Sequence, residues 1–72
     1  MLNTNYAPEI ATASRFLEEN KEDIALMNFI KIMQSPFYTH ADRWGRIYDF
    51  ILEHYPSYID TVVTGLTYYC EG

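Results

Sequence analysis

Apolar residues recur at helical spacing along this chain, and the clearest repeat lies between residues 40 and 55. There, aromatic and aliphatic side chains stand three or four positions apart, so they share one side of a helix. Arg43 and Arg46 fall mostly outside this stripe and are expected to face water. The predicted helix has Thr39 as its N-cap and ends before Pro56. Its apolar stripe consists of Trp44, Ile47, Tyr48, Ile51, Leu52 and Tyr55.

Residues 21 to 34 predict a second helix, which Ser35 and Pro36 should end. Asn20 is its expected N-cap, because an Asn side chain accepts well from the free amides of a first turn. Glu22 and Asp23 would then lie at the positive end of the helix dipole. Apolar residues occur on several sides of this helix, so it should be covered from more than one direction. Its main stripe consists of Leu26, Phe29, Ile30 and Met33.

Shorter helices are expected near the two ends of the chain. Pro8 fits a first helical turn, where a missing amide hydrogen costs nothing, and a helix is predicted over residues 8–19. Ser57, followed three residues later by Asp60, repeats the cap-and-acid pattern and predicts the start of a last helix. The apolar stripe of this last helix consists of Ile59, Val62, Val63, Leu66 and Cys70.

Residues 61–70 also suit a β-strand, because they are rich in β-branched and aromatic side chains. Gly65 adds to this ambiguity, since a glycine costs a helix interior about 1 kcal/mol. A lone strand would find no pairing partner in this chain, which favours the helix unless a dimer supplies the partner. In a helix, Gly65 would permit the close approach of another helix.

The predicted fold is all-α: a small bundle of three to four short helices in a single domain, residues 1–72, with an ordered core of about residues 6–70. The helix over residues 40–55 is expected at its centre, with the second and last helices packed against it. A chain of 72 residues hides only about 60% of the surface that its unfolded form exposes. Completing the core as a homodimer is therefore an alternative to a monomer.

Charge and cysteine content narrow the classes of partner and compartment. Ten acids against five bases give a net charge of −5, which disfavours contact with nucleic-acid phosphates or anionic lipids and favours a partner with a basic surface. Cys70 is the only cysteine, so no disulfide within the chain is expected and a reducing compartment is indicated. The sequence contains no secretion signal and no apolar run long enough for a membrane span. We expect a cytoplasmic protein.

Catalytic and metal-binding motifs are missing from the sequence. The candidate metal ligands His40, His54 and Cys70 have no zinc-site spacing, and the two histidines stand too far apart on one helix to share an ion. Asp49 and Glu53 lie one turn apart, but such acid pairs are common on solvated helix faces. No glycine-rich phosphate loop occurs. We therefore expect no enzyme activity, no catalytic or metal-binding residue, no cofactor and no small-molecule substrate.

Seven tyrosines in 72 residues exceed what so small a core should bury, because each buried hydroxyl needs a hydrogen-bond partner. Tyrosines near helix ends therefore suggest a protein interface. The alternative is that their rings rim the core while their hydroxyls face water. Arg43 and Arg46 beside Trp44 and Tyr48 give a mixture that is also used on nucleic acids, but flanking acids argue against direct contact. The candidate partner-binding residues are Tyr38, His40, Phe50, Tyr55, Tyr58, Tyr68 and Tyr69.

These features favour a small acidic, non-enzymatic protein-binding module. By compositional analogy, we expect a regulator or inhibitor of a larger protein that handles nucleic acid, of the kind found among phage and mobile-element accessory proteins. One alternative is a structural homodimer. Another is an acidic mimic of DNA that blocks a nucleic-acid-binding site, whose binding should fall steeply as salt rises. The acids that would imitate phosphates are Glu18, Glu19, Glu22, Asp23, Asp49, Glu53 and Asp60.

Overall fold

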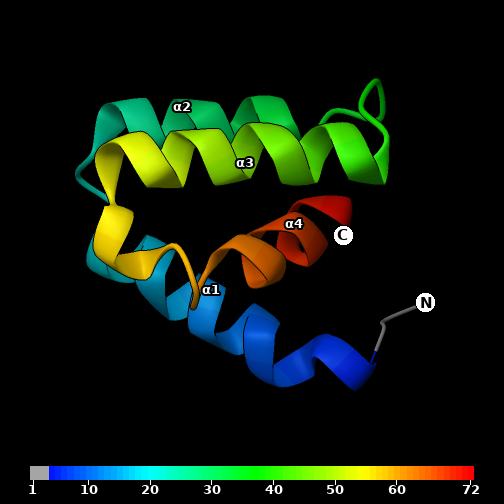
Figure 1. Ribbon diagram of the computed structural model, residues 1–72, viewed down its shortest axis with the longest axis horizontal. Coiled ribbons are helices and arrows are strands. Elements are labelled where there is room, and N and C mark those ends of the chain that lie inside the picture. The colour runs from blue at the N-terminus through cyan, green and yellow to red at the C-terminus, as the bar shows by residue number, and fades with distance from the viewer. Residues whose placement is uncertain (1–3) are drawn as a thin grey trace.

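In a computed structural model of the protein, which describes residues 4–72, the chain forms four α-helices, two short 3-10 turns and no strand within that range (Figure 1). The predicted all-α bundle is confirmed, and residues 1–3 of the predicted domain lie outside the described residues. In chain order, the elements are η1 Thr4–Tyr6, α1 Ala7–Glu19, α2 Ile24–Met33, α3 His40–His54, η2 Pro56–Tyr58 and α4 Val63–Glu71.

The helix at the centre of the bundle is α4. Figure 1 shows α2 and α3 running side by side, with α4 between that pair and α1. Helix α4 packs against α1 and α3 and also touches α2. The prediction that the helix over residues 40–55 would be central is therefore wrong. The physical reason is that α4 has no charged side chain before Glu71, so it loses little when several of its sides are covered.

Gly65 allows α4 to approach α1 very closely. A Cβ atom at this position would lie 2.1 Å from the backbone carbonyl oxygen of Glu9 and 3.0 Å from the Cβ of Ala13. Both predictions about this segment, a helix and a close helix contact at Gly65, are confirmed. The competing strand over residues 61–70 does not form, because α1 and α3 cover the apolar sides of α4.

The caps of α2 and α3 are made by side chains. The prediction for α3 is confirmed, since the Thr39 hydroxyl accepts a hydrogen bond from the amide of Asp42 at 3.1 Å. The prediction that Asn20 caps the second helix is wrong. Asp23 is that cap, accepting from the amide of Leu26 at 3.1 Å, whereas the Asn20 side chain donates to the carbonyl of Phe16 and closes α1. The acidic cap is favoured because it adds a negative charge at the dipole's positive end.

The last helix begins later than the pattern at Ser57 predicts. Ser57 lies inside η2, and α4 starts at Val63 without a side-chain cap. The amides of Thr61 and Val62 donate to the carbonyl of Tyr58 instead, which forms a tight turn between η2 and α4. Backbone hydrogen bonds thus satisfy this turn, and the expected hydroxyl cap is not used.

Helix α3 turns a different face to the core than the one predicted. Ile47 and Ile51 are fully buried, as expected, but Arg43 is buried beside them with only 6% of its surface exposed. Three members of the predicted stripe lie on the exposed flank instead: Trp44, Tyr48 and Leu52, at 40%, 36% and 50% exposed. Arg43 stands four and eight residues before the two isoleucines, so it continues their row toward the helix start.

Candidate functional site

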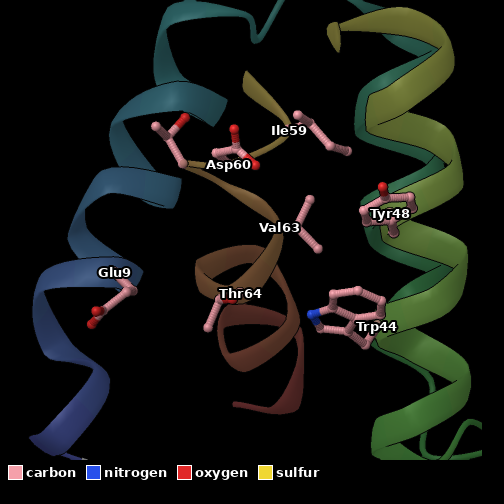
Figure 2. A pocket seen from close by; sticks show the side chains of 8 residues that line it. Glu9, Trp44, Tyr48, Ile59, Asp60, Val63 and Thr64 are labelled. Atoms are coloured by element: carbon pink, nitrogen blue, oxygen red, sulfur yellow. The ribbon is translucent and has the colours of Figure 1, made fainter. Parts of the chain in front are cut away.

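A hollow of about 370 Å³ opens between α1, α3 and the start of α4 (Figure 2). Helix α3 contributes aromatic side chains, α1 contributes an acid, and the turn before α4 contributes a second acid together with apolar and hydroxyl side chains. Its lining therefore combines aromatic and apolar side chains with hydroxyl groups and two acids. The residues that line it are Glu9, Trp44, Tyr48, Ile59, Asp60, Thr61, Val63 and Thr64.

The α3 side of the hollow is an exposed aromatic surface. The rings of Trp44 and Tyr48 are stacked, with centroids 5.2 Å apart and planes inclined by 23°. Figure 2 shows the indole of Trp44 pointing from α3 toward α4. Leu52 lies one further turn along the same flank, so the three residues form a continuous apolar stripe, here called the α3 stripe. Large exposed side chains that adjoin one another in this way are typical of binding surfaces.

The negative charges of the hollow lie on its other sides. Asp60 is found just before α4, and Glu9 extends from α1 on the side opposite Trp44, with its carboxylate pointing away from the rings (Figure 2). Both residues are exposed, and neither forms an ion pair with any of residues 4–72. No basic residue lines the hollow. Its electrostatics therefore favour a cation over an anion.

Arg43 holds the start of α3 against the end of α2. Its Nε donates to the carbonyl of Met33 at 2.6 Å and its Nη2 to the carbonyl of Ser35 at 2.8 Å. Its Nη1 lies 3.5 Å from a carboxylate oxygen of Glu71 at the end of α4. Burial of this guanidinium is tolerated because its donors are satisfied. Sequence reasoning missed this residue, although its place in the row of Ile47 was visible.

Two of the predicted partner-binding residues make internal contacts. The Tyr55 hydroxyl donates to the Asp23 carboxylate, which lowers the pKa of Asp23 and raises the pKa of Tyr55 to about 12. Phe50 stacks on Phe29 with centroids 4.3 Å apart, which joins α3 to α2. Both residues are half-buried, so part of each ring remains at the surface.

The other predicted partner-binding residues do not gather on one surface. At one end of the bundle, His40 bonds the Glu71 carboxylate through Nδ1, and Tyr68 stacks on Tyr6 with ring centroids 4.0 Å apart. Tyr38 lies in the α2–α3 loop, under the guanidinium of Arg46, and Tyr69 is half-buried on α4. Tyr58 is exposed on η2. Their role in partner binding stays a prediction.

The acids proposed to imitate phosphates lie mostly at the end of the bundle where α1 ends, α2 begins and α3 meets η2 (Figure 1). Some of these acids form ion pairs or caps within the protein. Glu18 pairs with Lys21 at 2.7 Å, Glu53 lies 3.4 Å from His54, and Asp23 is the cap of α2. This region, here called the acidic end, comprises Glu18, Glu19, Glu22, Asp23 and Glu53. Asp49 lies one turn further into α3, and Asp60 lies at the hollow.

Residues 4–72 were also compared with what a metal site, a reactive thiol and a membrane-spanning helix require. No three His, Cys, Asp or Glu side chains lie close enough together there to hold a metal ion. Burial raises the pKa of the Cys70 thiol to about 11, so this thiol is protonated and unreactive near neutral pH. None of the described helices combines the length and apolar character needed to cross a bilayer.

Comparison with known proteins yields no similar protein family, curated protein or solved structure.

Proposed function

We propose that this protein is a small non-enzymatic protein-binding module that recognises a larger protein through the α3 stripe and the hollow beside it. The single observation that carries this proposal is that Trp44, Tyr48 and Leu52 remain exposed in a row while the core face of α3 is already filled. Tryptophan and tyrosine dominate the energetically important centres of protein interfaces. An exposed aromatic row is therefore better explained by a partner than by the stability of the free chain.

The partner we propose carries a basic surface. The chain has a net charge of −5, and the two carboxylates at the hollow have no counter-charge within residues 4–72. Opposite charge on the partner would speed association and fix the orientation of the complex. Proteins that handle nucleic acid commonly carry such surfaces. A regulator or inhibitor of such a protein in the cytoplasm, of phage or mobile-element accessory type, fits this chemistry by compositional analogy.

The proposal is tested by photo-crosslinking in cells that express the protein naturally. A photoreactive amino acid replaces Leu52 in one variant and Ile32 in a matched control on α2, because the two side chains are 50% and 54% exposed. We expect one discrete crosslinked protein from position 52 and none from position 32. Equal crosslinking from both positions, or none from position 52, would refute the proposal. A product that contains only two copies of this chain would support the homodimer instead.

The DNA-mimic alternative is favoured by one observation, the gathering of acids at the acidic end. Mimicry acts through long-range charge, which salt screens over about 8 Å at physiological ionic strength. Binding of the crosslinked partner is therefore measured from about 50 to 500 mM salt. A steep fall with salt that survives Trp44→Ala would favour mimicry. Moderate salt dependence with strong loss in Trp44→Ala would favour the α3 stripe.

A further inference from the structure

We propose that the hollow receives an arginine side chain of the protein partner, laid over the rings of Trp44 and Tyr48 with its guanidinium directed toward Asp60. This inference rests on the proposed function and names the group by which the partner is recognised. The occupant is an arginine within a basic segment of another protein. A lysine, or an arginine of a second copy of this chain, are outcomes that the experiment below separates.

The aromatic side of the hollow suits a planar cation. The two rings are stacked and inclined by 23°, so each partly covers one face of the other, and the faces that remain open are those of an indole and a phenol. Cations are attracted to such faces, most strongly to tryptophan, and a guanidinium can in addition stack flat on the ring. The fold contains the same kind of contact elsewhere, where the Arg46 guanidinium lies 5.1 Å from the ring centroid of Tyr38.

The acidic side of the hollow supplies the charge that an arginine requires. The Asp60 carboxylate forms no ion pair within residues 4–72 and stands at the edge of the hollow in Figure 2. A guanidinium offers parallel N–H donors that match the two oxygens of a carboxylate, which an ammonium cannot do. Glu9, on the α1 side and turned outward, would attract the flanking bases of the same segment.

The protein's own bases leave this site free. Arg43 is bonded to two carbonyls at the end of α2, Arg46 lies over Tyr38, and Lys21 pairs with Glu18. None of the chain's five basic residues lines the hollow. At about 370 Å³, the hollow lies near the lower end of the range for binding pockets, a size suited to one side chain. Val63 and Thr64, which also line the hollow, would contact the aliphatic part of the arginine.

The test uses the intrinsic fluorescence of Trp44, the only tryptophan of the chain, together with its single indole N–H resonance. The full-length protein is titrated with three short peptides, acetyl-Ala-X-Ala-amide, in which X is arginine, citrulline or lysine. We expect saturable changes of both signals with arginine, at least threefold weaker binding of lysine, and no saturation with citrulline, which keeps the shape of arginine but lacks its charge. Citrulline as effective as arginine, or lysine equal to arginine, would overturn the proposal.

Two matched variants test whether the Asp60 carboxylate is the charge that binds the arginine. Asp60→Asn should weaken arginine binding at least threefold, whereas Asp49→Asn, an exposed acid on α3 that does not line the hollow, should leave it unchanged. Circular dichroism verifies that both variants stay folded. Equal behaviour of the two variants would overturn the role of Asp60. Signals of Trp44 that change with protein concentration in the absence of peptide would replace the external partner by a second copy of this chain.

The two proposals fail in distinguishable ways. If position 52 crosslinks to a partner but none of the peptides perturbs Trp44, the surface binds protein and the arginine is wrong. If neither position 52 nor the peptides give a signal, both proposals fall. If the arginine peptide binds and position 52 captures no partner, the cation site stands and the protein-binding role of the α3 stripe is overturned.

Discussion

Two helical glycines provide a sharp test of the packing between α1 and α4. Gly65 lies on α4, where a Cβ atom would stand 2.1 Å from the carbonyl oxygen of Glu9. Gly45 lies on α3, where a Cβ atom would meet nothing within 4 Å. The same substitution, glycine to alanine, is therefore expected to have opposite effects at the two positions.

The magnitudes follow from helix propensity and from the clash. Alanine is more favourable than glycine in a helix by about 1 kcal/mol, which is the whole effect expected for Gly45→Ala. At Gly65, ordinary contact begins at 3.4 Å, so the α1 backbone would have to withdraw by well over an ångström. Overpacking of this kind costs about 1–3 kcal/mol or more, and here the obstacle is backbone that cannot rotate away. Because backbone is the obstacle, we take the upper end of this cost, about 3 kcal/mol, and after the propensity gain of about 1 kcal/mol we expect a net loss of about 2 kcal/mol.

A loss of that size is a large share of the stability of so short a chain. At about 0.05–0.15 kcal/mol per residue, 72 residues give a free energy of unfolding of roughly 4–11 kcal/mol. In a domain of this length, 1 kcal/mol changes the melting temperature by about 4–8 °C. Gly65→Ala should therefore melt about 8–16 °C below the wild type, and Gly45→Ala about 4–8 °C above it.

Urea unfolding followed by circular dichroism, with thermal melts of the same samples, measures both variants. A Gly65→Ala variant as stable as the wild type would contradict this prediction, because α1 would then not rest on the backbone of α4 at this point. A loss of stability in Gly45→Ala would equally contradict the open space described there.

Three further predictions concern side chains inside the bundle. Arg43→Met should lower the unfolding free energy by about 3 kcal/mol, because buried carbonyls lose charge-assisted donors, whereas Arg46→Met should cost less than about 1 kcal/mol in the same urea titrations. Tyr55→Phe should lose a stabilisation that in the wild type is present above the ordinary pKa of Asp23 and below pH 10. This contribution disappears as pH falls through the lowered pKa of Asp23 or rises toward the Tyr55 pKa of about 12. A stability difference between the two proteins that does not change with pH would contradict the prediction. Cys70 should react with iodoacetamide at least about a hundredfold more slowly in the native protein than in urea, because its raised pKa and burial leave little accessible thiolate.

The exposure of Trp44 decided the candidate site, and the periodicity alone pointed the other way. An apolar stripe predicts which side of a helix is hydrophobic, but it does not tell how far around the helix the covering elements reach. On α3 the cover extends toward Arg43, whose guanidinium is satisfied by carbonyls at the end of α2. The aromatic flank on the other side is then left in solvent.

The local sequence determined that these segments form helices and that Thr39 is a cap, because helix periodicity, proline breaks and hydroxyl caps act within a few residues. For residues 61–70 the sequence favoured a helix over a strand without deciding between them, since the chain offers no partner to a lone strand, and in a helix it pointed to a close contact at Gly65. Only the tertiary structure decided that α4 is central, that Arg43 is buried and that Trp44, Tyr48 and Asp60 border one hollow. These features depend on contacts between residues far apart in the chain, and a local pattern alone does not determine them.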